Sequence, residues 1–484
     1  MRLRATNSQP SAARARGSVL IIVLWAAFGL VAVALYFAQT TSFELRAADA
    51  RVAALEAEQA IASAALYVSN VLATLVSPGT VPDPQLYACQ AVPVGEAAFW
   101  LLGRSDATVA GDQVAFGLID EAAKLNLNTA TVEMLQMLPR MTPELAAAIV
   151  DWRDANTTPT TGGAESDVYL RLNPAYRCKD APFESVEELR LVYGMTLELL
   201  FGEDANLNGV LDPNENDGTM AFPYDNRDGR LDPGLLEYLT IYSREPNTRT
   251  NGAQRINVAG TNQTQLANLL QEKGFSVDRA NEILRNLGFS PTGTGSAGGP
   301  GGTGGRGGAN PGGTPTPTAT QPVGSLLEFY IRSGMTPEEF ALIEADITVS
   351  TNQVQQGLIN INTASAAVLA CVPGIGPEHA AEVVAYRQNR WASLLANPSV
   401  AWVVDVIGQT NAIQAGPYLT ARSYQFTADV VAVGHHGRGL QRVRFVFDTT
   451  DGLPRIVYRQ DLTHLGWPLG TEVRRQLRLA QNRP

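Results

Sequence analysis

The chain has 484 residues, of which 45% are hydrophobic, and its formal net charge is −11. At roughly 100 to 200 residues per domain this length allows two to four domains, and the hydrophobic content excludes a wholly disordered chain. The excess of acids over Lys and Arg argues against a general nucleic-acid binder, because a phosphate-facing surface must be basic. The cysteines are too few for a disulfide framework and lack the spacing of zinc ligands: Cys89, Cys178 and Cys371.

The amino terminus has the pattern of a membrane anchor. An uncharged apolar run extends from Ser18 to Ala38, and four arginines precede it. About 20 apolar residues span the hydrocarbon core of a bilayer, whereas the apolar core of a secretory signal is about 7 to 15 residues long. The basic leader and Glu44 beyond the run predict a cytoplasmic amino terminus. We therefore predict a single transmembrane segment at 18–38.

Residues 39–77 are expected to continue the same helix. This segment contains no Pro or Gly and is rich in Ala, Leu and Glu, which favour helix. Apolar residues recur in it at helical spacings and predict one apolar stripe along the helix: Leu45, Val52, Leu55, Ile61, Ala65, Val68, Leu72 and Leu75. The result is one helix of about 60 residues that emerges from the membrane.

The basic leader 1–17, which ends in Gly17, and the apolar run directly after it resemble prepilin-like proteins. The resemblance implies that prepilin peptidase cuts between Gly17 and Ser18 and that the new amino terminus is methylated. Most such proteins carry glutamate at the fifth mature position, where this chain has Ile22. That departure is typical of the minor pseudopilin K family of type II secretion systems.

The rest of the chain predicts an α/β unit that is interrupted by helices. Segment 78–123 begins with a proline-rich loop and contains two short apolar runs that indicate a strand pair, Ala97–Arg104 and Gln113–Asp120. Segment 413–470 contains three alternating stretches that predict antiparallel strands. Between them lies a helical region, 124–412, with a flexible Gly/Pro/Thr linker at 290–324. The basic tail 471–484 is expected to be loose.

The predicted fold class is therefore α+β. A long amino-terminal helix packs on a small antiparallel sheet, and a large helical domain is inserted into that unit. The family resemblance implies the same arrangement, a pseudopilin fold with an inserted helical domain.

Three related segments begin at Lys124, Arg255 and Leu358, each with an apolar-Asn-apolar start, a polar cap and two helices joined by a turn. The third, 358–390, has the helix-hairpin-helix pattern. Thr363 is the predicted N-cap of its first helix, and Pro377 is predicted to open its second.

Helix-hairpin-helix segments permit two interpretations. A Gly-x-Gly hairpin can present backbone N–H groups to a DNA phosphate, or the hairpin can serve only to pack two helices together. Glu378 and Glu382 occupy the helix that a phosphate would approach, and the first copy lacks the hairpin glycines. We favour packing, and the family resemblance agrees.

An acidic segment, 204–237, predicts metal binding. The sequence from Asp204 to Glu215 matches the calcium-loop template D-x-[DN]-x-[DN]-G-x5-E. The predicted oxygen donors of this first loop are Asp204, Asn206, Asn208, the Val210 carbonyl, Asp212 and Glu215. A second, incomplete loop repeats the pattern with Asn226, Asp228, the Arg230 carbonyl and Asp232, and Asp217, Asp225 or Glu237 is expected to supply a missing ligand. One or two calcium ions are expected, as the family resemblance also implies.

No catalytic motif stands out, so an enzyme is not expected. Cys89 and Cys178 can pair in an oxidising compartment, whereas Cys371 is expected to be a buried thiol, and His435 and His436 an exposed turn.

The family resemblance implies a minor pseudopilin at the tip of the type II secretion pseudopilus, anchored in the inner membrane with its bulk in the periplasm. The implied partners are the minor pseudopilins I and J, other pseudopilins, the inner-membrane secretion platform and prepilin peptidase. Nucleic acid is not among them. The alternative from another class is a membrane-anchored, competence-like protein that holds DNA with its hairpins.

Overall fold

The computed structural model describes residues 15–75, 77–104, 113–220, 222–260, 263–289 and 322–481. The first part of the predicted leader (1–14) and most of the predicted linker (290–321) lie outside the described residues. At the end of the predicted linker, Val323 is described, and its side chain is buried in the core of the helical domain.

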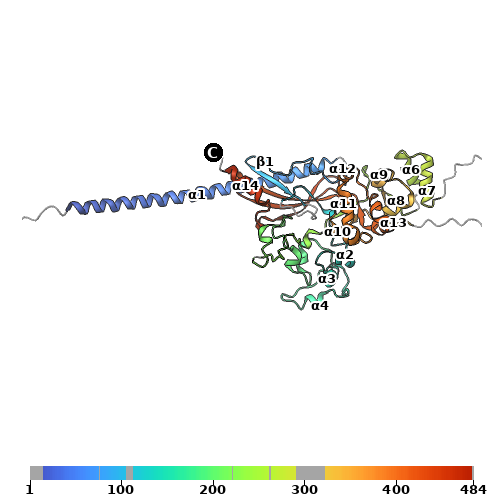
Figure 1. Cartoon of the computed structure of the whole chain (residues 1–484), viewed down its shortest axis with the longest axis horizontal. Helices are drawn as coiled ribbons and strands as arrows, with labels where there is room; N and C mark the ends of the chain where they lie inside the picture. Colours follow the sequence, from blue (N-terminus) through green and yellow to red (C-terminus); the bar gives the residue numbers. More distant parts are fainter. Residues whose placement is uncertain are drawn as a thin grey trace, which may run out of the picture.

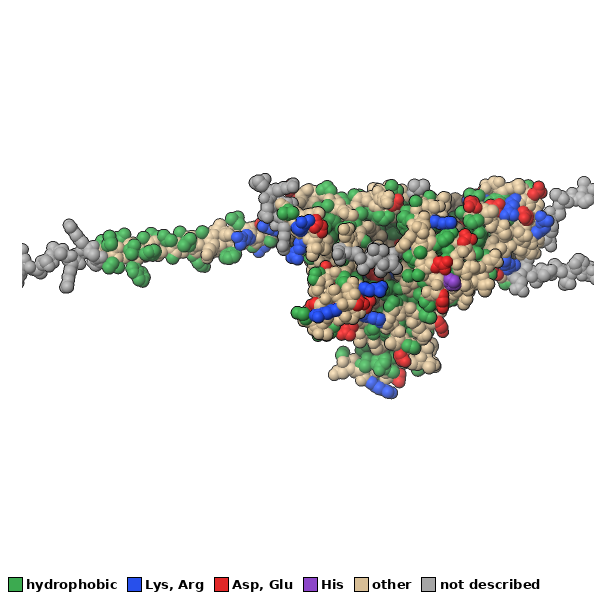
Figure 2. All heavy atoms as spheres, in the orientation of Figure 1, with side chains coloured by type: hydrophobic (Ala, Val, Ile, Leu, Met, Phe, Trp, Pro, Cys, Tyr) green, Lys and Arg blue, Asp and Glu red, His purple; other side chains and the backbone are tan. Residues whose placement is uncertain are grey.

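Helix α1 (Ala15–Ala73) is the longest element and confirms the predicted continuous helix. Its first half projects from the globular part of the molecule (Figure 1), and the apolar side chains from Val19 to Phe37 are exposed there. Figure 2 shows these hydrophobic side chains around the projecting rod. Within the described residues this is the one helix long and apolar enough to cross a membrane.

The second half of α1 packs on an antiparallel sheet with the strand order β1-β2-β12-β13-β14. Its strands are β1 (Val92–Val94), β2 (Ala97–Leu102), β12 (Gln425–Val433), β13 (Gln441–Asp448) and β14 (Arg455–Asp461). The three carboxyl-terminal strands are the predicted ones. The predicted pairing of the two early runs is confirmed in part, because Leu102 and Phe116 form an antiparallel bridge. In addition, β2 and β3 (Ile119–Asp120) each pair with β12. Strand β12 is nine residues long and buried throughout, so it has room for both.

The two faces of the sheet are covered by helices from opposite ends of the chain. Helix α1 covers one face with an alanine row, Ala57, Ala60 and Ala64, which packs with the sheet residues Phe99 and Val430. Helix α14 (Gly470–Gln481) covers part of the other face.

Helix α14 overturns the expectation of a loose basic tail. Its residues Val473 and Leu477 are four positions apart and pack against a cluster formed by Trp100, Val431 and Leu469. Arg474 and Arg475 leave the chain basic on the solvent side, so the segment is amphipathic rather than uniformly polar.

A helical domain is inserted between β3 and β12 and contains its own hydrophobic core. Its α-helices are α2 (Val132–Gln136), α3 (Pro143–Arg153), α4 (Ser166–Tyr169), α5 (Leu197–Phe201), α6 (Gln263–Glu272), α7 (Val277–Asn286), α8 (Leu326–Ser333), α9 (Pro337–Ile343), α10 (Ala366–Ala370), α11 (Gly376–Gln388), α12 (Trp391–Ala396) and α13 (Val403–Ala415). Helices α6 to α9 lie at the end of the molecule farthest from the projecting rod (Figure 1).

Each of the three repeats opens with a two-residue strand that has a parallel partner. The opening strands are β4 (Leu125–Asn126), β7 (Ile256–Asn257) and β10 (Ile359–Asn360), and their partners are β5 (Leu239–Thr240), β8 (Ile347–Thr348) and β11 (Leu419–Thr420). Each partner reads apolar-Thr. The repeat is thus larger than its sequence signal, because every copy is closed by a strand that lies far along the chain. One further antiparallel pair joins β6 (Arg244–Pro246) to β9 (Val354–Gln356).

Candidate functional site

The predicted apolar stripe of α1 is divided into a buried part and an exposed part. Its later residues pack into the chain's own sheet core: Ile61, Ala65, Val68, Leu72 and, partly buried, Leu75. Its earlier residues Leu45, Val52 and Leu55 remain exposed, and so does Leu66, which is 75% exposed. Leu55 and Leu66 are eleven residues apart, or close to three helical turns, so they lie on the same side of the helix. The described residues leave this side of α1 uncovered.

The turn between β12 and β13 holds α1 in place. His435 contacts Asp49 through Nε2 at 2.9 Å and Glu56 through Nδ1 at 2.7 Å, and its backbone N–H also donates to Glu56. The imidazole of His435 is therefore enclosed by carboxylates of α1, which corrects the expectation of an exposed turn for this residue. Arg438 adds an ion pair to Asp49.

The first acidic loop folds around its own predicted ligands. The carboxylate of Asp204 accepts the backbone N–H groups of Asn208 at 2.9 Å and Gly209 at 2.8 Å. The two oxygens of Glu215 accept the N–H groups of Ala205 and Asp212, both at 2.9 Å. The carboxylates at loop positions one and twelve therefore both bind backbone N–H groups within the loop and hold it in one tight turn.

Electrostatics in this loop favour a cation. Burial raises the pKa of Glu215 to about 8, and the charges of Asp204 and Asp212 add to the rise. Burial also raises the pKa of Asp204, against the opposing effect of Arg104. The Oδ1 atom of Asn206 is buried without a hydrogen-bond partner in the described residues. The carboxylate oxygens of Asp204 and Glu215 each keep a second lone pair beyond their N–H bond, and these donors suit a hard cation. Asp212 Oδ2, in contrast, accepts the side-chain amides of Asn206 at 2.6 Å and Asn208 at 3.1 Å.

Two guanidinium groups fasten this loop to the sheet. Arg442 donates to the carbonyls of Asn206 and Leu207, and its charge is balanced by Asp429 at 2.8 Å. Arg104 also donates to the Leu207 carbonyl. The side chains of Arg442 and Asp429 are fully buried, and the two arginines on β13, Arg442 and Arg444, lower the pKa of Asp429. The inserted loop and the sheet are therefore one packed unit.

The second acidic loop is exposed, and its end contacts a carboxylate that the sequence analysis did not assign to it. Asn226 and Asp228 accept backbone N–H groups two residues further on. Glu203, which is 5% exposed, accepts the N–H of Asp232 at 3.1 Å. Glu203 directly precedes the first loop, so the template could not place it in the second.

The expected substitutes for the missing second-loop ligand are engaged elsewhere. Glu237 pairs with Arg104 at 2.8 Å. Asp225 accepts the N–H groups of Asp217 and Gly218 at 2.8 and 2.7 Å and thereby shapes the turn between the loops.

The hairpin of the third repeat is packed against protein. A Cβ on Gly374 would meet the Asn411 carbonyl oxygen of α13 at 2.4 Å, and Ile375 is 1% exposed. The N-cap of α10 is Ser365 rather than the predicted Thr363, whose hydroxyl donates to Asp120 at 2.5 Å. Pro377 is the second residue of α11, one position after the predicted one.

Basic residues near this hairpin have structural partners. Arg387 is 2% exposed and donates to the Ile361 carbonyl, as Arg153 of the first repeat donates to the Leu127 carbonyl. Arg390 lies over the Tyr386 ring, 4.4 Å from its centroid. In the first and third repeats these arginines therefore tie the helix pair to the residue after its opening strand, and Arg390 covers an aromatic ring.

The cysteines do not form the suggested pair. Cys89 packs at the edge of the sheet core, whereas Cys178 is buried in the core of the inserted domain, and both are free thiols. Cys371 is a buried thiol as expected. Gly17 and Ser18, the predicted cleavage residues, lie in the first turn of α1.

Two parts of the chain match models of known protein families or motifs. A model described as type II secretion system (T2SS), protein K matches residues 120–201, and a helix-hairpin-helix motif model matches residues 354–392. Type II secretion system protein K of Klebsiella pneumoniae is 33% identical over 108 residues, which are 20% of this chain and 33% of that protein. The protein of the same name from Pectobacterium carotovorum subsp. carotovorum is 41% identical over 56 residues, 12% of this chain and 17% of that one.

The matched regions are short. The chain spans about a third of the length of the first relative and less of the second. A solved GspK-GspI-GspJ complex from the enterotoxigenic Escherichia coli type 2 secretion system contains a similar chain, with a TM-score of 0.36 and 10% identity over 87% of this chain and 98% of that one. The family match ends at residue 201, before the first acidic loop.

Proposed function

This chain belongs to the type II secretion system protein K family, and we propose that it is a minor pseudopilin at the tip of a secretion pseudopilus. The observation that carries the proposal is the division of α1. Its first half is apolar and exposed, as a membrane anchor and a filament core both require, while its second half is fixed to a globular head. Such a helix can leave the membrane and enter a helical bundle without refolding.

The head suits the terminal position of a filament. The inserted domain extends well beyond the sheet on the side away from the projecting rod (Figure 1), which leaves little room for a further subunit above it. Ile22 in place of an acid removes a partner for the amino terminus of a neighbouring subunit. We place the anchor in the inner membrane and the head in the periplasm, after prepilin peptidase has cut between Gly17 and Ser18. The role is structural rather than catalytic, and the other pseudopilins and the inner-membrane platform are further partners.

The exposed side of α1 is the surface we assign to the minor pseudopilins I and J. Leu55 and Leu66 are 59% and 75% exposed on the part of α1 that packs on the sheet. Large apolar side chains that line one side of a helix are typical of helix-to-helix packing. In contrast, the buried side of the same helix is occupied by the chain's own sheet.

Co-purification tests this assignment. Tagged full-length chain, extracted in detergent, should retain the minor pseudopilins I and J of the same cell. Leu55→Glu and Leu66→Glu should abolish retention because a charge replaces apolar contact, and both should keep the wild-type melting temperature. The matched control is Leu86→Glu, since Leu86 is 84% exposed but lies outside α1. Equal retention by all three variants would show that this side of the helix is not the interface.

We also propose that calcium stabilises the head. In the first loop Asp204, Asn206, Asn208, Asp212 and Glu215 would hold the ion together with the Val210 carbonyl. The ion would offset the mutual repulsion of buried carboxylates. In the second loop Asn226, Asp228, Asp232 and the Arg230 carbonyl would be joined by Glu203. Extracellular calcium modules bind with dissociation constants on the order of 10⁻⁴ to 10⁻³ M.

Thermal unfolding tests the calcium proposal. Calcium at 10 to 100 times its dissociation constant should stabilise the chelator-treated full chain by about 1.4 to 2.7 kcal/mol. Asp204→Asn should remove most of this gain, because its carboxylate is at the centre of the buried loop. Asp278→Asn, an exposed change on α7, should leave it intact. A melting temperature that calcium does not change would refute the assignment while leaving the pseudopilin proposal standing.

A further inference from the structure

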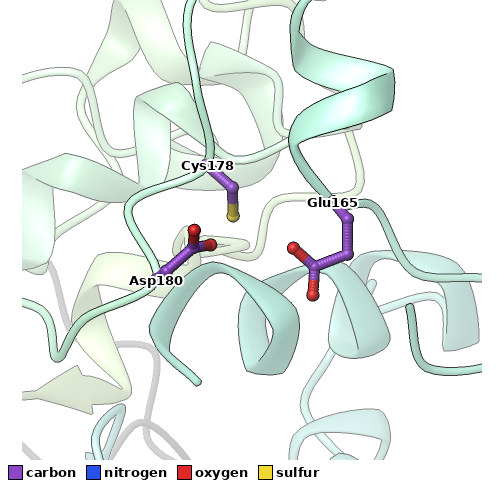
Figure 3. A group of neighbouring side chains, drawn as sticks. All are labelled: Glu165, Cys178 and Asp180. Carbon is purple, nitrogen blue, oxygen red and sulfur yellow. The ribbon is translucent and has the colours of Figure 1, made fainter. Parts of the chain in front are cut away.

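A second group of candidate ligands lies outside the acidic loops, in the first part of the inserted domain. Glu165, Cys178 and Asp180 each direct one ligand atom into the same space, and these atoms lie within 4.8 Å of one another. Figure 3 shows the thiol between the two carboxylates. Glu165 directly precedes α4, whereas Cys178 and Asp180 lie in the irregular segment that follows it.

Three carboxylate oxygens of this group lack the hydrogen bonds that burial normally demands, whereas the Cys178 thiol donates to the Asp151 carbonyl at 3.7 Å. Glu165 is 3% exposed, and both of its carboxylate oxygens are buried without a hydrogen-bond partner in the described residues. The Oδ1 atom of Asp180 is in the same condition. A buried carboxylate without donors costs several kcal/mol unless a cation or a proton compensates it. Glu165 stands at the N-cap position of α4, yet its side chain does not cap the helix.

Neighbouring acidic side chains add further negative charge around Glu165. Burial raises the pKa of Glu165 to about 7, and the charges of Asp151, Asp180 and Asp154 add to the rise. The backbone N–H of Ser166, the first residue of α4, has the opposite effect. Lys179 stands between two members of the group in sequence but pairs with Glu188 at 2.8 Å. Burial likewise raises the pKa of Cys178 to about 12. No described cation therefore neutralises these groups.

We propose that Glu165, Cys178 and Asp180 form a binding site for a thiophilic divalent cation, with zinc as the expected ion. A thiolate with two carboxylates suits zinc and excludes calcium, which takes oxygen ligands. Zinc bonds of about 2.0 to 2.3 Å place tetrahedral donors about 3.5 Å apart. Because the three ligand atoms lie within 4.8 Å of one another, they need to approach by about 1 Å at most on binding. The second oxygen of Glu165 or a water molecule completes the coordination.

Binding would exchange a proton for the ion. The Cys178 thiol gives up its proton as the sulfur–zinc bond forms, and a protonated Glu165 gives up another. The ion then links the start of α4 to the irregular segment and closes a loop of chain between Glu165 and Cys178. Such a link would hold a stretch that has few regular elements of its own.

Metal titration of the full chain in detergent tests this site. Chelator-treated protein should bind zinc and release protons, and cobalt should give a sulfur-to-metal charge-transfer band. Cys178→Ser and Glu165→Gln should weaken zinc binding by more than the roughly 10- to 100-fold that loss of an outer-shell partner causes. Cys371→Ser is the matched control because Cys371 is also a buried thiol but belongs to no such group of candidate ligands among the described residues.

The isosteric Glu165→Gln change keeps the test decisive if the serine variant fails to fold. The proposal is overturned if wild-type protein binds no zinc, if cobalt gives no sulfur band, or if Cys371→Ser and Glu165→Gln bind zinc equally well. Asp204→Asn should retain zinc binding, which separates this site from the calcium loops.

Discussion

A single carboxylate, Asp120, joins the sheet to the third repeat. It accepts the hydroxyls of Ser423 at 2.6 Å and Thr363 at 2.5 Å, and the amide of Asn360 lies 3.3 Å away. Burial raises the pKa of Asp120 to about 6, while the two hydroxyls partly offset the rise. Hydroxyl donors from two parts of the fold therefore partly offset the cost of burying the Asp120 carboxylate. Its neighbour Glu121 makes similar bonds to Thr240 and Thr427.

The raised pKa of Asp120 predicts a pH dependence with a definite sign. In the unfolded chain the pKa is about 3.9, so the folded state binds the proton more tightly. The associated stability is complete below about pH 4, falls as pH rises to about 6, and amounts to about 3 kcal/mol. Melting temperatures of Asp120→Asn should therefore fall less between pH 4 and 7 than those of wild type. Asp278→Asn should parallel wild type, and a parallel Asp120→Asn curve would contradict the argument.

At the scale of elements, α1 approaches the sheet closely because small residues meet at the contact. A Cβ on Gly434 would lie 2.2 Å from the Ala53 carbonyl oxygen, and one on Gly439 would meet the backbone carbon of the same residue at 2.4 Å. Gly434 has an ordinary φ of −74°, so a substitution there tests space rather than backbone strain. Ala53 of α1 and these glycines are therefore two sides of one close contact.

Gly434→Ala should loosen the long helix from the head. Overpacking costs about 1 to 3 kcal/mol, since α1 or the turn must move. The expected result is a lower melting temperature and faster proteolysis of α1 near Ala53. Gly260→Ala is the matched control, because a Cβ at Gly260 meets nothing within 4 Å. If both variants melted and were cleaved alike, the close approach would have no energetic weight.

Elements with a strong local pattern were predictable from the sequence. The continuous α1 follows from the apolar run 18–38 and from the absence of Pro and Gly in the segment after it, and β12, β13 and β14 follow from alternation. The partner strands of the repeats were missed because two residues such as Leu419–Thr420 carry no periodicity and depend on a distant strand. Helix α14 was missed because its basic composition concealed a short apolar side.

The same limit applies to the candidate sites. The candidate donors of the first acidic loop are close together in the sequence, so the template could select them without the structure. Glu203 belongs to the second loop only through folding, and the group of Glu165, Cys178 and Asp180 has no recognisable spacing. Sites assembled from irregular segments are therefore visible only when the chain is folded.

At the scale of the whole molecule, the repeats act as a packing framework. In each copy the Asn of the opening strand reaches the segment just after the closing strand: Asn126 bonds to Ser243, Asn257 to Ser350 and Asn360 to Ser423. The bonds bring together segments more than sixty residues apart in every copy. The three copies thereby build the inserted domain whether or not their hairpins contact a ligand.

This arrangement predicts that the molecule does not hold DNA, the alternative function. Non-specific DNA binding depends on cations that replace counterions, with dissociation constants of about 10⁻⁴ to 10⁻⁶ M at physiological salt. In the third repeat Arg387 is buried, Arg390 covers Tyr386, and Glu378 and Glu382 stand on the second helix. Full chain in detergent at micromolar concentration should therefore leave labelled duplex DNA unshifted at low salt. The wild-type protein should be compared with the double variant Glu378→Lys and Glu382→Lys, because this variant adds cations while leaving the packed hairpin unchanged. A salt-sensitive shift by wild-type protein that is lost on changing Gly376 to Val would establish the hairpin as a phosphate site and would require a different function for the inserted domain.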